Sequence, residues 1–143
     1  IHTTMKSEKF LSEKLRFSER YKNKKVIFGI DKSHKLTGVN LKLNVIRKHL
    51  GLHPHLRRKV KLIQMVEASR HCSQETTDQQ IQELQALALV INEECGEEVV
   101  LIVHQEEVSL ATRYAYFAIA HALFVTSIRD GLCLEPFEYI TVL

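Results

Sequence analysis

The sequence has little of what builds a disulfide framework, a membrane span or a flexible linker. Its 143 residues include three cysteines, Cys72, Cys95 and Cys133, and none of them forms a Cys-x-x-Cys pair. An odd number of scattered cysteines argues against a disulfide framework and against a zinc site, and is typical of a reducing compartment. No apolar run approaches the roughly 20 residues that span a bilayer, and the polar, charged start is not typical of a signal peptide. We therefore expect a cytoplasmic protein without a membrane partner.

Repeats, low-complexity segments and Gly/Ser-rich linkers are also missing. A chain of this length without a linker is the size of one domain. We expect a single domain over residues 1–143, with a leading helical segment at 1–24. The sequence begins at Ile1 and stops within the apolar run 140–143. Because natural termini are usually polar and frayed, we expect a truncated domain from a longer protein.

Charge is divided unevenly along the chain. Residues 1–70 hold 18 Lys/Arg against 5 Asp/Glu, whereas residues 71–143 hold 2 against 12. A basic half is one mark of nucleic-acid binding, but aromatic side chains that would stack on bases do not recur among these lysines and arginines. Small ligands that carry phosphate also favour a basic loop. We expect no nucleic-acid partner.

Apolar patterning predicts strands and helices in alternation. Short, unbroken apolar runs predict buried strands, and apolar residues spaced by three and four predict amphipathic helices. The expected order is strand 25–30, helix 39–50, strand 60–66, a helix from near Thr77 to Gly96, strand 99–103, helix 110–120 and strand 123–127. Gly51 is expected to close the first helix, a capping box at Thr77 to open the second, and Ser109 to cap the third.

This alternation is typical of an α/β fold with a parallel sheet and right-handed crossovers. All strand-to-helix loops then meet at one edge of the sheet, where open α/β sheets bind ligands. The last of these loops, 128–138, carries Asp130 and Glu138, whose carboxylates suit sugar hydroxyls; a solvated Asp-Gly turn is the alternative. The eight histidines show no metal-ligand spacing, and we expect no metal.

A series of short motifs runs along residues 12–143. The motifs are Gly29-Ile30-Asp31, Gly38, Lys42-Leu43, His53-Pro54, Lys59-Val60-Lys61-Leu62-Ile63-Gln64, Ser69-Arg70, the run from Thr126 to Gly131, and Phe137-Glu138-Tyr139. In this order and spacing, the series resembles the C-terminal half of trehalose-6-phosphate synthases, which are glycosyltransferases of the two-domain GT-B type.

The resemblance implies a Rossmann-like parallel sheet with helices on both faces, as part of the C-terminal, donor-binding domain of a GT-B fold. It implies transfer of glucose from UDP-glucose to glucose-6-phosphate with retention at the anomeric carbon, giving trehalose-6-phosphate and UDP in trehalose biosynthesis. It implies no cofactor and no metal. Because the acceptor site needs an N-terminal domain of the same chain, we expect residues 1–143 alone to be inactive.

Matched residue by residue, the resemblance assigns two catalytic residues, Lys32 at the leaving diphosphate and Asp130 at the donor glucose. It assigns Glu138 to the ribose hydroxyls and Arg70 to the phosphate of the acceptor. The remaining substrate-binding positions that it implies are Thr37, Gly38, Gly131, Leu132, Cys133 and Leu134. Lys35 is a further candidate, as a substitute for the lysine that the family has at position 37, although the geometry of a diphosphate site is demanding.

Several of these positions depart from the family's pattern. Lys32 stands where the family has arginine, so it keeps the charge but loses the bidentate fork. Thr37 stands where the family has a lysine, so a charge-assisted contact of about 1.5–3 kcal/mol is missing at that position. In the last turn, Leu132-Cys133-Leu134-Glu135 replaces Met-Asn-Leu-Val, and Glu135 adds a negative charge near a dianionic ligand. The alternative is therefore a catalytically impaired, synthase-like domain with a regulatory or scaffolding role.

Overall fold

The computed structural model describes residues 1–33, 37–69, 72–105, 109–127 and 132–143. The helices are α1 (His2–Met5), α2 (Glu8–Arg20), α3 (Val39–Leu52), the 3-10 helix η2 (Pro54–Leu56), α4 (Gln74–Cys95), α5 (Leu110–Ile119) and α6 (Glu135–Val142). The strands are β1 (Lys25–Lys32), β2 (Val60–Glu67), β3 (Val100–Gln105) and β4 (Ala122–Leu123).

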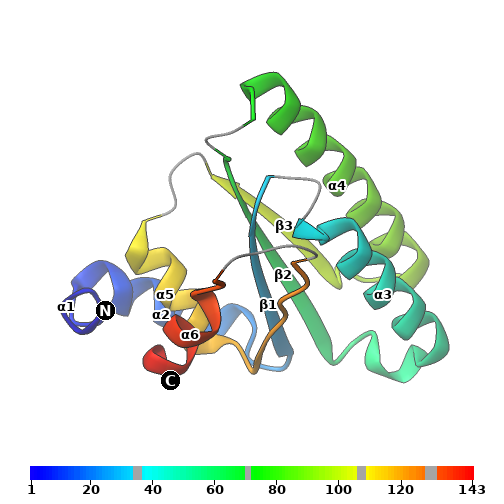
Figure 1. Cartoon of the computed structure of the whole chain (residues 1–143). Helices are drawn as coiled ribbons and strands as arrows, with labels where there is room; N and C mark the ends of the chain where they lie inside the picture. The colour runs from blue at the N-terminus through cyan, green and yellow to red at the C-terminus, as the bar shows by residue number, and fades with distance from the viewer. Residues whose placement is uncertain (34–36, 70–71, 106–108, 128–131) are drawn as a thin grey trace.

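The four strands form one parallel sheet in the order β3-β2-β1-β4 (Figure 1). β1 pairs with β2 over its whole length, from Lys25 opposite Val60 to Lys32 opposite Glu67. The chain moves outward from β1 to β2 and β3, and then returns through α5 to the other side of β1. This reversal creates a topological switch point between β1 and β4, which is where open α/β sheets form their ligand crevice.

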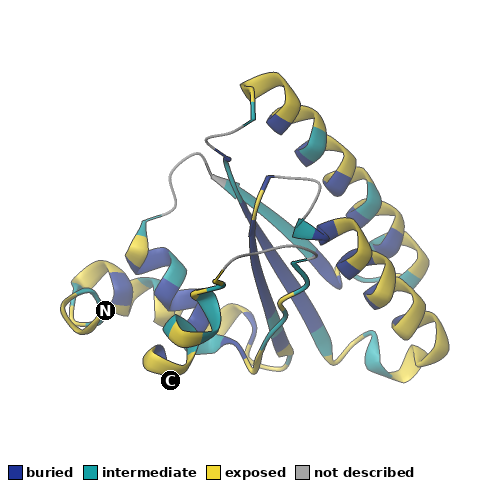
Figure 2. Cartoon of the chain, in the orientation of Figure 1, coloured by how far each residue is buried: buried dark blue, intermediate teal, exposed yellow. Residues whose placement is uncertain are grey.

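Helices cover both faces of this sheet (Figures 1 and 2). On one face, Leu43 of α3 and Ile91 of α4 pack in a cluster with Leu62 of β2. On the other face, α2 and α5 cover the strands, and the ring of Phe117 lies edge-on to that of Phe28, with centroids 5.5 Å apart. Each fully buried side chain of this size contributes about 1.5–3 kcal/mol. The predicted Rossmann-like α/β fold is confirmed.

Two helix boundaries differ from the prediction. α4 begins at Gln74, one turn before Thr77, because the Ser73 hydroxyl accepts the N–H of Thr76 at 3.2 Å and caps the helix there. α3 continues through Gly51 to Leu52, so Gly51 does not close it. Pro54 opens η2 instead and prevents the α-helix from continuing.

Two other helix ends are confirmed, while the last strand is shorter than expected. Gly96 closes α4 with a left-handed φ of 67°, and the Ser109 hydroxyl accepts the N–H of Thr112 at 3.2 Å to cap α5. β4 spans two residues rather than 123–127; one further backbone hydrogen bond, from the Phe124 N–H to the Phe28 carbonyl at 2.8 Å, extends its pairing with β1. Within the described ranges, no helix has both the length and the apolar character needed to cross a membrane.

Candidate functional site

The carboxyl ends of β1 and β2 lie side by side at the edge of the switch point. Lys32 pairs in register with Glu67, so both strands end at one level. Beyond them α3 begins at Val39, after Gly38, whose φ of 74° is left-handed. Glycine adopts this conformation without the strain that a Cβ would add, and the Gly38 carbonyl accepts the Lys42 N–H at 3.0 Å. Gly38 therefore fixes the point where the loop turns into the helix.

A buried polar cluster lies directly behind this loop. The Lys42 amine, 0% exposed, donates to Asp31 Oδ2 at 2.7 Å and to Gln64 Oε1 at 2.9 Å. Gln64 Nε2 in turn donates to Asp31 Oδ2 at 2.8 Å and to the Met65 carbonyl at 2.9 Å. The three side chains come from α3, β1 and β2, so the cluster joins the end of β1 to the helix that follows it.

Gly29 is required by this cluster. A Cβ at position 29 would lie 2.2 Å from Gln64 Oε1 and 2.7 Å from Lys42 Nζ. Both distances are far below van der Waals contact, and both atoms are fixed by hydrogen bonds to Asp31 or to each other. The glycine of the Gly29-Ile30-Asp31 motif thus makes room for the lysine and the glutamine.

Burial dominates the electrostatics of the cluster. Burial raises the pKa of Asp31 above its usual value, although the Lys42 charge and the hydrogen bonds from Lys42 and Gln64 oppose that shift. Burial likewise lowers the pKa of Lys42, against the opposing effect of Asp31. The Lys42 amine also lies 5.6 Å from the ring centroid of Phe124, which follows β4. Lys42 therefore contacts groups on both sides of the switch point.

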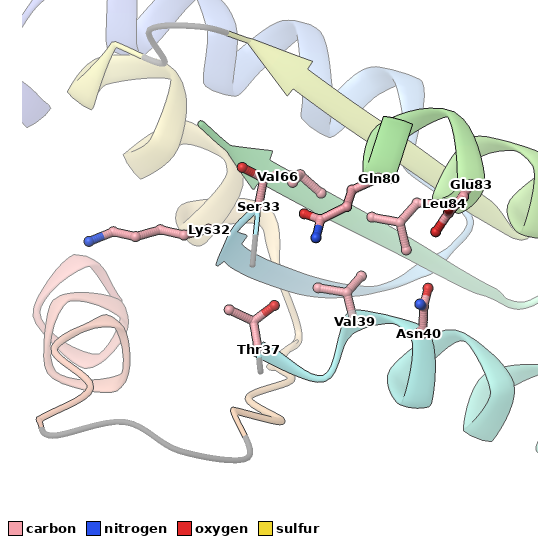
Figure 3. Close-up of a pocket in the computed structure, with 9 residues that line it drawn as sticks. All are labelled: Lys32, Ser33, Thr37, Val39, Asn40, Val66, Gln80, Glu83 and Leu84. Carbon is pink, nitrogen blue, oxygen red and sulfur yellow. The ribbon is translucent and has the colours of Figure 1, made fainter. Parts of the chain in front are cut away.

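A cavity of about 310 Å³ opens between the end of β1, α3 and α4. The residues that line it are Lys32, Ser33, Thr37, Val39, Asn40, Val66, Gln80, Glu83 and Leu84 (Figure 3). The Lys32 amine points away from the other labelled side chains, and its charge acts on Glu135 of α6. Among the lining residues that the structure describes, the other polar side chains are neutral except for the Glu83 carboxylate. The Lys32 charge is therefore directed to the α6 side of the site rather than into this cavity.

On the α6 side, Arg113 of α5 forms ion pairs with carboxylates of two other elements, β2 and α6. Its Nη2 donates to Glu138 Oε2 of α6, and its Nη1 lies 3.6 Å from Glu67 Oε1 at the end of β2. Glu135 Oε1 is 3.9 Å from Nη2. The Arg113 side chain is 15% exposed and that of Glu138 is 26% exposed, so this ion-pair group borders solvent.

The turn before α6 adds a thiol to this region. The Cys133 thiol donates to Glu135 Oε2 at 3.0 Å. Burial alone would raise the pKa of Glu135, but hydrogen bonds from Cys133 and from a backbone N–H, with the charges of Arg113 and Lys32, hold it below its usual value. Glu135 is therefore a carboxylate at neutral pH, and two cations offset its charge.

Comparison with known proteins identifies the family of this fold and site. The sequence profile of glycosyltransferase family 20 matches residues 1–143. The chain belongs to glycosyltransferase family 20.

Two relatives illustrate the range of names among proteins similar to this chain. Trehalose-phosphatase of Schizosaccharomyces pombe is 35% identical over 133 residues, covering 91% of this chain and 16% of that protein. Alpha,alpha-trehalose-phosphate synthase [UDP-forming] 5 of Arabidopsis thaliana is 33% identical over 126 residues, covering 85% of this chain and 14% of that protein. The chain thus spans about one sixth of the length of such relatives.

Solved structures of other proteins share this fold. The N-terminal domain of trehalose-6-phosphate phosphatase from Candida albicans has a TM-score of 0.80 and 26% identity, covering 93% of this chain and 28% of that one. An E. coli structure with UDP-2-fluoro glucose bound has a TM-score of 0.78 and 21% identity, covering 90% of this chain and 29% of that one. The α/β architecture is that of a GT-B domain.

The structure brings together part of the predicted site. Lys32, Thr37 and Gly38 lie at the end of β1, while Cys133 precedes α6 and Glu138 lies in its first turn. Glu138 pairs with Arg113, and Cys133 hydrogen-bonds to Glu135, on which the charges of Arg113 and Lys32 act. Leu132 and Leu134 are exposed, at 71% and 54%. Four predicted site residues, Lys35, Arg70, Asp130 and Gly131, lie outside the described residues.

Sequence reasoning missed three residues that organise the described part of the site: Lys42, Gln64 and Arg113. A signal existed for the first two. Lys42 sits within the predicted apolar stripe of 39–50, and Gln64 interrupts an apolar strand, and a polar residue in such a place needs a buried partner. Arg113 carried a weaker signal, as one of only two basic residues in the acidic half of the chain.

Proposed function

We propose that this chain forms part of the donor-binding domain of a trehalose-6-phosphate synthase, which transfers glucose from UDP-glucose to glucose-6-phosphate. In this reaction the bond from the glucose anomeric carbon to the UDP oxygen breaks. A bond from that carbon to an acceptor hydroxyl oxygen forms with retention, the hydroxyl proton is lost, and UDP leaves. The observation that supports the proposal is the switch point between β1 and β4 of a family 20 chain, beside which three described motif residues, Asp31, Lys42 and Gln64, meet.

The roles of the described residues follow from their positions. The Lys32 amine, directed toward α6, offsets charge on the leaving diphosphate, and positioned cations of this kind contribute by analogy about 10²–10³ in rate. Gly38 brings the N-terminus of α3 to the loop, where backbone N–H groups favour an anion. The turn 132–134 lies beside the donor, and Glu138 accepts hydrogen bonds from the ribose hydroxyls. Arg70, Asp130 and Gly131 keep the roles that the resemblance implies, and Lys35 stays a candidate substitute for the charge missing at Thr37.

Two findings on relatives support this proposal. Relatives that match 85% or more of the chain carry the name trehalose-phosphate synthase. Structures with this fold hold UDP-2-fluoro glucose in one case and glucose-6-phosphate in another. In the proposed enzyme an N-terminal domain of the same chain supplies the acceptor side of the cleft.

The test is turnover by the full-length protein with UDP-glucose and glucose-6-phosphate, followed by mass spectrometry of trehalose-6-phosphate. We expect product from the wild type and a loss of about 10²-fold or more in kcat for Lys32→Ala, since a positioned cation is removed. Residues 1–143 alone should give none. Wild-type protein that binds neither UDP nor UDP-glucose would contradict the proposal.

A second candidate is a synthase-like domain without turnover that serves regulation or scaffolding. Two observations favour it: Thr37 lines the end of β1 without the lysine charge of the family, and Glu67, Glu135 and Glu138 surround one arginine at the proposed donor site. The Candida albicans phosphatase domain shows that this fold occurs in a protein named for another activity.

Thr37→Lys separates the two candidates. If the missing charge alone limits catalysis, this substitution should raise kcat by about 10²–10³ in the full-length protein. Thr37→Met, of similar length without charge, is the matched control. Binding of UDP-glucose without turnover in wild type and in Thr37→Lys would favour the regulatory role.

A further inference from the structure

The attachment of α6 to the rest of the fold depends on few contacts. Within α6 only Val142 is buried, while Phe137 and Ile140 are 62% and 68% exposed. The Tyr139 hydroxyl donates to the Ala120 carbonyl at 3.1 Å, and its ring lies near that of Phe117. These contacts hold the second half of the helix. The first turn, which carries Glu138, is tied to the domain chiefly through Arg113.

Arg113 itself comes from a rigid position. Its helix, α5, is buried along the sheet, with Ala115 and Phe117 both 0% exposed. The guanidinium lies 5.7 Å from the Phe117 ring centroid, and its Nη1 forms an ion pair at 3.6 Å with Glu67 at the end of β2. A guanidinium held in this way presents a fixed fork of donors, which selects one orientation of a carboxylate.

The atoms used in the contact matter for ligand binding. Arg113 Nη2 donates to Oε2 of Glu138, whose side chain is 26% exposed and borders solvent. A carboxylate oxygen has two acceptor positions, so Oε1 can accept two hydroxyl donors while Oε2 stays with the arginine. Without the arginine, Glu67, Glu135 and Glu138 would repel one another and the Glu138 carboxylate would lose its fixed orientation.

We propose that Arg113 is a positioning residue that orients the Glu138 carboxylate toward the two hydroxyls of a nucleotide ribose. This inference rests on the proposed function, because it takes Glu138 as the ribose-binding group. Arg113 makes the site selective for ribonucleotides without itself touching the ligand. Arg113 and Glu138 thus act as one unit.

The experiment compares UDP with 2′,3′-dideoxy-UDP by calorimetry on the full-length protein. The measured quantity is the ratio of their Kd values for wild type, Arg113→Met and Arg113→Lys. We expect a wild-type ratio above about tenfold, a ratio near one for Arg113→Met, and an intermediate ratio for Arg113→Lys, which keeps the charge but loses the fork. A purely structural arginine would change both Kd values equally and leave the ratio unchanged.

Arg47→Met is the matched control, because Arg47 forms an exposed ion pair with Glu94 between α3 and α4, away from α6. Its ratio should equal that of wild type. Each ratio compares two ligands on one sample, so a smaller folded fraction does not alter it. If Arg113→Met does not fold, the ratio of Arg113→Lys decides.

If the ratio of the two Kd values in Arg113→Met equals that of wild type, the role of Arg113 is overturned and the proposed function still stands. If Arg113→Met does not fold, the same conclusion follows from a wild-type ratio in Arg113→Lys. A wild-type ratio near one, with UDP still bound, overturns the role of Glu138 and with it this inference. A wild type that binds no UDP overturns the inference together with the proposed function.

Discussion

Lys42→Met should destabilise the protein strongly, because it removes the cation from a carboxylate that cannot reach water. Lys42 is 0% exposed and Asp31 is 7% exposed, and the amine donates to both Asp31 and Gln64. Methionine fills a similar volume, so the loss is mainly electrostatic. Breaking a buried ion pair by removing one partner costs about 3–5 kcal/mol. The hydrogen bond from Gln64 Nε2 to Asp31 remains, which favours the lower end of this range.

The free energy of unfolding in urea measures this loss. The matched variant is Lys42→Met with Asp31→Asn, in which no buried charge is left without a partner. We expect the double variant to recover at least half of the loss, because neutral amides at positions 31 and 64 can hydrogen-bond to each other. A loss below about 1 kcal/mol for Lys42→Met would refute the reasoning, since that is the size of an exposed pair.

The pH dependence gives an independent check with a definite sign. Burial raises the pKa of Asp31 while Lys42 opposes the shift, so loss of Lys42 raises that pKa further. The folded variant then takes up a proton at a pH where the unfolded chain does not, and stability increases as pH falls through the folded-state pKa. The deficit of Lys42→Met relative to wild type should therefore shrink between pH 7 and pH 5. A deficit that stays constant or grows over this range would show that Asp31 is not the affected group.

Three further predictions concern single side chains. Gly29→Ala should destabilise the protein by about 1–3 kcal/mol in urea unfolding, because the added Cβ displaces the buried cluster. Gly51→Ala, where an added Cβ meets nothing within 4 Å, should stabilise α3 by about 0.5–1 kcal/mol. Equal effects of the two substitutions would contradict the steric argument. Ser73→Ala should cost about 0.5–2 kcal/mol through loss of the α4 cap, and an unchanged unfolding midpoint would place the cap elsewhere. Glu138→Gln should weaken UDP binding in calorimetry by about 1–3 kcal/mol while Glu135→Gln leaves it unchanged or tightens it, and an affinity unaffected by Glu138→Gln would remove that residue from the proposed donor site.

The order of elements was predictable because apolar periodicity records which faces are buried. Strand 25–30 and helix 39–50 were placed within two residues of β1 and α3 at each end. The start of α4 was not, because Thr77 with Gln80 three residues on forms a capping-box pattern, whereas Ser73 has Thr76 at that position and nevertheless caps the helix. Only the packing of Thr77, which is 1% exposed, shows that it lies inside α4. β4 was overestimated because its apolar run continues past the point where pairing with β1 stops.

The candidate site was predictable in its location but not in its internal contacts. Motifs assigned residues to a ligand, and the alternation of elements located their loops at one edge of the sheet. Arg113 pairs with Glu138, 25 positions further along the sequence, and no local sequence pattern predicts a pairing over that separation. The same holds for Asp31 and Gln64, which meet only because β1 and β2 pair in one register. Long-range polar contacts depend on the assembled fold.

The pairing of β1 with β4 also constrains how the site forms during folding. Val26 of β1 and His121 beside β4 hydrogen-bond across 95 positions of sequence. Closing such a long loop costs chain entropy that only the finished interface recovers, and contacts of this separation slow folding. β1, β2 and β3 can pair beforehand through consecutive crossovers, whereas β4 must dock after α5 has crossed the sheet. The pairing of β1 with β4 is therefore expected late in folding, so that binding of the proposed nucleotide donor would report completion of the fold rather than its early stages.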